Sequence, residues 1–195
     1  MGRDFKMISK NFPQMIFHFQ EQSPFPIKGT IIDFETIGEI HNNLNNHEKY
    51  KDIDPVIFGT LENTQILISY IEEIDYIPAL IQLIQVRIQD LTPPFYAFNC
   101  KFEQNIIKNH LGLQVKFEEL QSRPYEKKEK CVIELGIPGY GDPFNGNGNL
   151  CRQAWLDGRI QECIKHNRAC LLKEAEILKR RVNELNNQTF SLERG

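Results

Sequence analysis

The stretch Gly29-Thr30-Ile31-Ile32-Asp33-Phe34-Glu35-Thr36 (residues 29–36) begins with apolar residues and ends with acids. A short apolar run that follows a glycine is typical of a buried strand. Because residues i and i+2 of a strand face the same side, we expect the carboxylates of Asp33 and Glu35 to lie together. Two neighbouring carboxylates repel unless a cation separates them, and Mg²⁺ and Mn²⁺ prefer carboxylate oxygens. The stretch therefore predicts either a metal site at a strand end or a pair of solvated acids.

The sequence on either side of this strand contains further strand and helix patterns. The order of these patterns favours a mixed α/β sheet covered by helices in a single domain. A long exposed loop is expected at 37–54 and another at 137–149. The expected elements are a short strand within 15–19, a hairpin of 55–60 and 65–71, helices at 76–91, 101–111, 127–135 and 159–185, and strands at 95–98 and 115–120.

Composition sets limits on the class of protein. The chain has 195 residues, of which 41% are apolar and 25% are charged, so a wholly disordered or fibrous chain is excluded. The formal net charge is −3, and no global basic field indicates nucleic acid. The charge is uneven, however, because the first 120 residues are acidic and the remainder is mildly basic.

Cysteine usage and hydropathy predict a cytoplasmic, soluble protein without a membrane partner. The five cysteines are odd in number and include no Cys-x-x-Cys pair, which argues against a disulfide framework or a zinc ribbon. No apolar run approaches the roughly 18 residues of a membrane span, and the N-terminus lacks the apolar run of a secretory signal.

Two further motifs carry polar residues. Asn99 stands where a helix N-cap belongs and Glu103 lies in the first turn, which is also what ordinary helix capping requires. On the last predicted helix, four residues at successive i, i+4 positions share one face. That face is either a half-buried polar stripe or a general base, His166, beside metal-facing groups. The four residues are Glu162, His166, Cys170 and Glu174.

Together these motifs resemble the DEDD-type 3′-5′ exonucleases of the ribonuclease H-like superfamily. The closest resemblance is to a branch of predicted nucleases whose last motif reads His-Asn-x-x-Asp-Leu-Leu after a Pro-Gly loop. Ile137-Pro138-Gly139 and the stretch 166–172 stand in those places. The resemblance spans 28–182. It implies a ribonuclease H-like domain over 28–185, preceded by an extension at 1–27 and followed by a polar tail at 186–195.

The resemblance also implies an activity, which is divalent-metal-dependent hydrolysis of DNA or RNA. In that family four carboxylates hold two ions, Mg²⁺ or Mn²⁺. By resemblance, Asp33 would bridge both ions, Glu35 would bind one of them, and Glu103 would be the third acid. His166 matches the residue that would orient or deprotonate the attacking water.

Cys170 departs from the family pattern, because an aspartate is expected there and a thiol is a poor ligand for Mg²⁺. Glu174, one turn later, could take its place as a metal ligand. Alternatively, Cys170 and His166 could form a site for a softer ion such as Zn²⁺. A different class of function also stays open, in which a degenerate domain binds nucleic acid or a partner protein without cleaving.

Residues that flank the motifs are candidate contacts to a nucleic-acid end, with solvated surface residues as the alternative. The glycine-rich stretch at 145–149 is expected to form a flexible surface loop, which could lie near a substrate, and Trp155 is expected to anchor the last two helices in the core. The candidate substrate contacts are Thr36, Asn99, Lys101, Asn167 and Arg168.

Overall fold

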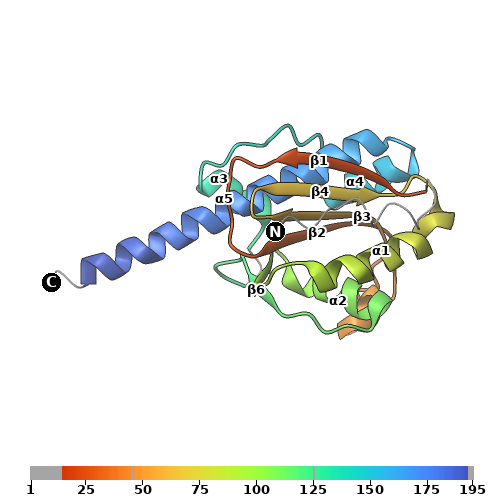
Figure 1. The fold of residues 1–195 in the computed structure, drawn as a ribbon, viewed down its shortest axis with the longest axis horizontal. Coiled ribbons are helices and arrows are strands. Elements are labelled where there is room, and N and C mark those ends of the chain that lie inside the picture. The colour runs from red at the N-terminus through yellow and green to blue at the C-terminus, as the bar shows by residue number, and fades with distance from the viewer. Residues whose placement is uncertain (1–14, 45, 125, 193–195) are drawn as a thin grey trace, which may run out of the picture.

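The computed structural model describes residues 15–44, 46–124 and 126–192 (Figure 1). Its centre is a six-stranded sheet with the order β1-β4-β3-β2-β5-β6. Neighbouring strands from β1 to β2 run antiparallel, whereas β5 and β6 add in parallel beside β2, so the predicted mixed sheet is confirmed. The strands are β1 (Phe17–Gln22), β2 (Thr30–Glu39), β3 (Asp52–Glu62), β4 (Gln65–Tyr70), β5 (Phe95–Ala97) and β6 (Phe117–Glu119).

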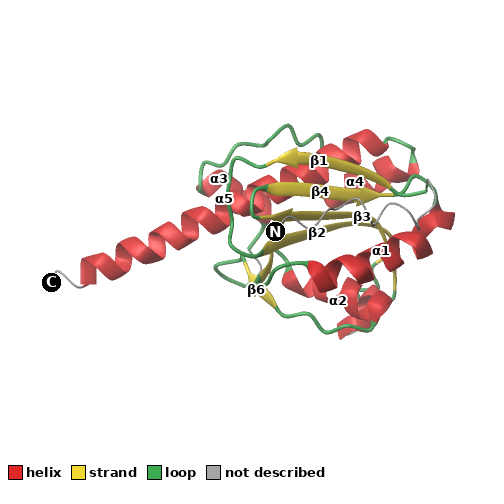
Figure 2. Cartoon of the chain, viewed as in Figure 1, coloured by secondary structure: helices red, strands yellow, loops and turns green. Residues whose placement is uncertain are grey.

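Helices cover both faces of this sheet (Figure 2). α1 and α2 lie along one face, and α4 and α5 pack across the other, where α5 contacts β2, β3 and β4. Among the described residues, the 3₁₀ turns η2 (Asn46–Tyr50) and η3 (Ile74–Tyr76) lie between the larger elements. No helix within the described residues combines the length and the apolar character that a membrane span requires. The α-helices in this part of the chain are α1 (Ile77–Asp90), α2 (Cys100–Leu111), α3 (Lys128–Glu134), α4 (Gly148–Leu156) and α5 (Ile160–Leu192).

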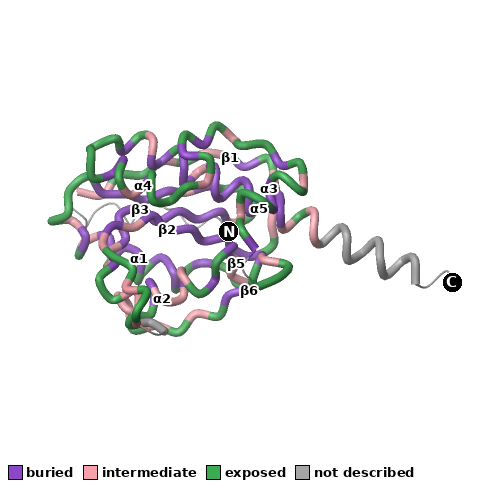
Figure 3. The backbone as a smooth tube through the Cα atoms, turned by 180° about the vertical axis from the view of Figure 1, so that it is seen from behind, coloured by how far each residue is buried: buried purple, intermediate pink, exposed green. Residues whose placement is uncertain are grey.

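β2 is the central strand, and its first six residues, Thr30 to Glu35, are all buried (Figure 3). A strand covered by helices on both faces needs apolar residues on both sides, which explains the run Ile31-Ile32. A bulge lies between Glu35 and Thr36. The two acids therefore lie within the strand, before the bulge, and not at a strand end.

The predicted exposed loop at 37–54 is wrong at both of its ends. β2 continues to Glu39 and β3 begins at Asp52, and these two residues pair in the antiparallel ladder. Their polar side chains suit the solvated ends of two paired strands, so composition alone could not separate strand from loop. The segment between them contains η2.

Three further elements refine the predicted organisation. β1 lies within the segment set apart as an N-terminal extension, and it pairs with β4 along its whole length. α4 begins inside the glycine-rich stretch, where Asn147 caps the helix by accepting a hydrogen bond from the Asn149 amide at 3.1 Å. α5 continues to Leu192. Trp155 is a core anchor as predicted, because it is buried and its Nε1 donates to the Ile71 carbonyl at 3.1 Å.

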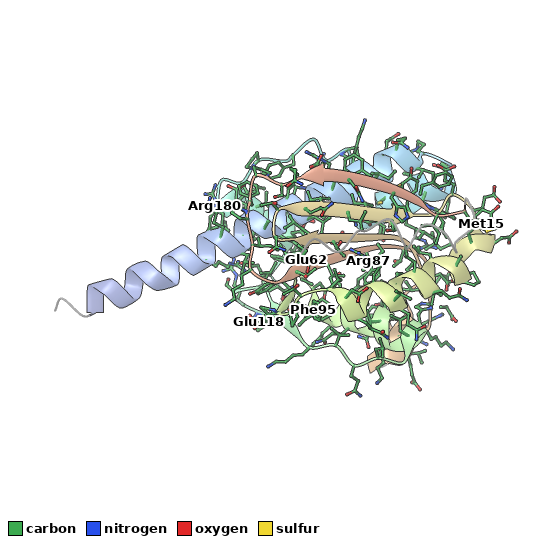
Figure 4. The ribbon with its side chains drawn as sticks, in the orientation of Figure 1. Met15, Glu62, Arg87, Phe95, Glu118 and Arg180 are labelled. Atoms are coloured by element: carbon green, nitrogen blue, oxygen red, sulfur yellow. The ribbon has the colours of Figure 1, made fainter. Side chains whose placement is uncertain are left out.

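Arginines on α5 fix the short helix α3. Arg180, labelled in Figure 4, donates through Nη1 to the Leu135 carbonyl at 2.6 Å, at the C-terminal end of α3. Arg181 donates to Glu126, just before α3, at 2.9 Å. α3 is therefore held at both ends against the long helix, which matters for the site because its first residue reaches the acids.

Gly59 of β3 lies where the sheet meets α5 most closely. A Cβ atom added there would overlap Asn167 Oδ1 and lie 3.1 Å from Leu171 Cδ1. We expect Gly59→Ala to lower the free energy of unfolding by about 1–3 kcal/mol, the usual cost of overpacking. Urea denaturation would measure this change. Gly139→Ala is the control, because a Cβ atom at Gly139 would meet nothing within 4 Å. Equal stability of both variants would contradict the close approach.

Candidate functional site

The two acids of β2 face α5, and an asparagine of that helix holds them. Asn167 is fully buried, and its Nδ2 donates to Asp33 Oδ2 at 2.7 Å and to the Asp33 carbonyl at 3.2 Å. The same amide lies 3.4 Å from Glu35 Oε1. One side-chain amide therefore orients both carboxylates.

Two more carboxylates approach Asp33 from other elements. Glu103, in the first turn of α2, and Glu174 of α5 are both buried. Burial, with Asp33 as a neighbour, raises the pKa of Glu103 well above its usual range and that of Glu174 to about 7. Their Oε2 atoms have no hydrogen-bond partner among the described residues. Four carboxyl groups, counting that of Glu35, thus meet at one place in the interior.

A lysine that the sequence reasoning missed lies among these acids. Lys128, the first residue of α3, donates from Nζ to Glu174 Oε1 at 2.6 Å and to Asp33 Oδ1 at 3.3 Å. Burial lowers the pKa of Lys128, but Cys170, Glu174 and Asp33 outweigh burial and raise it above its usual value. Lys128 is one of several lysines in a charged stretch, so no local pattern distinguishes it from a surface residue.

His166 is held by an aspartate that the sequence reasoning also missed. Its Nδ1 lies 2.7 Å from Asp142 Oδ1, and Lys173 Nζ donates to Asp142 Oδ2 at 2.6 Å. Asp142 also accepts the amides of Phe144 and Gly146, at 2.9 and 2.7 Å. The only sequence signal for it is the turn Gly141-Asp142-Pro143 inside the predicted loop.

The charge states of His166 and Asp142 follow from the contacts that each residue makes. Burial lowers the pKa of His166, but Glu35, Cys170 and the hydrogen bond to Asp142 raise it to about 12. Burial opposes ionisation of Asp142, yet its hydrogen bonds with His166 and Lys173 hold its pKa well below the usual range. These contacts therefore favour an imidazolium beside a carboxylate.

The other ring nitrogen of His166 faces two potential metal ligands. Nε2 lies 3.8 Å from Glu35 Oε1 and 3.9 Å from Cys170 Sγ. The three ligand atoms lie within 4.8 Å of one another, and all three residues are buried, so this triad could hold a metal ion. Burial raises the pKa of the Cys170 thiol above its usual value.

A pocket of about 720 Å³ opens onto these residues. The glycine-rich stretch 145–149 and Arg152 also line this pocket. Glu174 is not among the lining residues. The cluster lines the pocket through Asp33, Glu35, Glu103, Lys128, His166 and Cys170.

The predicted substrate contacts separate into three groups. Thr36 and Asn99 line this pocket, and Asn167 is bonded to the acids beneath it. Lys101 lines an adjacent cavity of about 590 Å³, which it shares with Asn99. Arg168 lies outside both, because its guanidinium pairs with Glu21 of β1 at 2.7 Å. Glu162 of the predicted helix face is only partly buried and pairs with Arg159 at 2.8 Å.

Comparison of this chain with models of known families, with curated proteins and with solved structures found no match.

Asp142 offers a test of how strongly the His166 arrangement is held. We expect Asp142→Asn to lower the free energy of unfolding by about 3–5 kcal/mol, because it leaves buried cationic partners unpaired. Asp52→Asn is a matched control, because Asp52 pairs with His41 at 2.6 Å but is largely exposed. That variant should stay within about 0.5 kcal/mol of the original chain. Similar losses in both, measured by chemical denaturation, would mean that the buried network contributes little.

Proposed function

We propose that this chain is a divalent-metal-dependent nuclease, specifically a 3′-5′ exonuclease that hydrolyses phosphodiester bonds in DNA or RNA. One observation carries the proposal. Asp33, Glu35, Glu103 and His166, which come from three motifs spread over more than half of the sequence, all line the same pocket. Surface acids and helix caps without a common role would not be expected to converge in this way.

The strand arrangement supports a ribonuclease H-like fold. In such a fold an antiparallel three-stranded meander is followed by parallel strands that add beside its first strand. β2, β3 and β4 form such a meander, and β5 and β6 add in parallel beside β2. β1 then lies outside this set, at the edge beside β4. Fold-level similarity of this kind supports the proposed function only by analogy.

The charge of the cluster fits a bound cation. Asp33, Glu35, Glu103 and Glu174 supply four carboxyl groups, whereas the cationic side chains paired with them among the described residues are Lys128 and, at 3.8 Å from Glu35, His166. The buried Oε2 atoms of Glu103 and Glu174 also lack partners in this part of the chain. Buried carboxylates need either protons or a cation, so a divalent ion suits the surplus.

The residues do not fit two ions as the resemblance implies. Lys128 Nζ lies 3.3 Å from Asp33 Oδ1 and 2.6 Å from Glu174 Oε1, between two of the carboxylates that a second ion would need. The Lys128 ion pairs within the described residues involve Asp33 and Glu174, whereas Glu35 Oε1 lies 3.8 Å from His166 Nε2, on another side of the cluster. A divalent ion bound there would polarise the phosphodiester and activate water. Lys128 would contribute a fixed positive charge to the scissile phosphate, and Asn167 would keep the carboxylates oriented.

The proposal is tested by incubating the chain with labelled single-stranded DNA and RNA in the presence of Mn²⁺ or Mg²⁺. We expect stepwise shortening from the 3′ end, and we expect Asp33→Asn to slow it by about 100-fold or more, because Asp33 is central to the carboxylate cluster. Asp75→Asn, an identical change at an exposed aspartate in η3, should leave the rate unchanged. Cleavage that persists in Asp33→Asn would show that another site or a contaminant is responsible.

A second candidate function is favoured by Lys128. Because its ammonium group neutralises part of the acidic cluster, the pocket could hold a nucleic-acid end without cleaving it. Cys170→Asp discriminates between the two functions, because it restores the hard ligand of the resembled family. A non-cleaving domain should gain cleavage by more than about 10-fold, whereas a chain that already uses its own ligand set should gain little. The measurement is the same shortening assay, run on both proteins at equal concentration.

A further inference from the structure

The ligand atoms that face the pocket differ in chemistry from those of a magnesium site. Glu35 offers a carboxylate oxygen, His166 an imidazole nitrogen and Cys170 a thiol sulfur, all within 4.8 Å of one another. Mg²⁺ prefers oxygen ligands, whereas Zn²⁺ and the related ions Co²⁺ and Mn²⁺ accept nitrogen, and Zn²⁺ and Co²⁺ also accept thiolate. The mixed set therefore selects a borderline transition-metal ion.

The distances fit an ion of that size. Around four-coordinate zinc, the usual bond lengths place neighbouring ligand atoms about 3.4–3.6 Å apart. His166 Nε2 lies 3.8 Å from Glu35 Oε1 and 3.9 Å from Cys170 Sγ. All three ligand atoms lie within 4.8 Å of one another, so the side chains would have to move closer together to bind one ion.

Asp142 gives independent support, because its contact with His166 matches the contact that metal-binding histidines usually make through their second ring nitrogen. A histidine that ligates a metal nearly always donates its other ring N–H to a carboxylate or a carbonyl. His166 Nδ1 lies 2.7 Å from Asp142 Oδ1, and that carboxylate is itself fixed by Lys173 and two backbone amides. The arrangement leaves Nε2 directed at Glu35 and Cys170, where its lone pair is available once the ring is neutral.

We infer that Glu35, His166 and Cys170 bind a single transition-metal ion of the zinc class, and that Lys128 takes the place of a second ion. Three protein ligands with a further position open to a pocket are typical of catalytic zinc sites. The three residues line the 720 Å³ pocket, so the open position faces the space a substrate would fill. The inference deepens the proposed function and rests on it only for the reaction that the metal would serve.

Cobalt provides a direct spectroscopic test, because Co²⁺ bound to a thiolate gives an intense sulfur-to-metal charge-transfer band. The chain would be purified under reducing conditions, stripped of metal with a chelator and titrated with Co²⁺. We expect one Co²⁺ per chain, a charge-transfer band that saturates with it, and displacement by Zn²⁺ but not by a large excess of Mg²⁺. Absence of the band, or saturation at two ions per chain, would overturn the inference.

Matched variants identify the ligand. Cys170→Ser should abolish the band and weaken Co²⁺ binding by about 10-fold or more. Cys131→Ser, a change at another buried free cysteine outside the pocket, should leave both unchanged. Glu35→Gln keeps the thiol, so it should weaken Co²⁺ binding while preserving the charge-transfer band. A preserved band in that variant would show that its loss in Cys170→Ser reflects the missing thiol and not a general disturbance or misfolding of the site. A band that survives in Cys170→Ser would assign it to another thiol and reject the site.

The two proposals can fail separately. If Co²⁺ binds as expected but no nucleic acid is cleaved with any of these ions, the metal site stands and the nuclease function fails. If Mg²⁺ alone supports cleavage and no thiolate band forms, the nuclease function stands and the inferred metal site is wrong.

Discussion

The structure depends on a surplus of negative charge in its interior. β2 places two carboxylates side by side under α5, and Glu103 and Glu174 approach the first of them from α2 and α5. Buried charges of one sign destabilise a fold unless other groups compensate them. Several polar groups that surround β2 compensate this buried charge. Asn167 supplies an amide and Lys128 an ammonium group, and burial raises the pKa of Glu103 and of Glu174, which favours their neutral forms.

The compensating groups have in turn shaped the packing. Asn167 reaches Asp33 only because β3 has a glycine opposite that residue. Hydrogen bonds of Arg180 and Arg181 tie α3 to α5 and so help to hold Lys128 near Asp33 and Glu174. The side of the cluster that holds His166 is organised separately, through Asp142, so the two halves of the site have different supports. This division agrees with the proposal that one half receives a metal ion while the other carries its own cation.

Residues with a local pattern were predictable from sequence, and residues defined by long-range contacts were not. The apolar run of β2, the hairpin spacing and the helical periodicity of α1 and α5 each reflect burial on a regular element. The acids of β2, with Glu103 and His166, could be named because they belong to motifs with fixed spacing. Lys128 and Asp142 belong to no such pattern, and their partners lie 95 and 24 residues away. The ends of β2 and β3 were missed because polar residues on a solvated strand end look like a loop.

The hydrogen bond between Asn167 and Asp33 also constrains how the chain reaches its final state. It joins residues 134 positions apart, so the ribosome synthesises the β2 acids long before their partners on α5. During synthesis on a ribosome, the sheet could form its antiparallel strands while these carboxylates stay hydrated and mutually repelling. Contacts of such long sequence separation slow folding, because the entropy of closing the loop opposes them. The buried acids at the centre of this domain therefore gain their partner amide only once α5 has emerged.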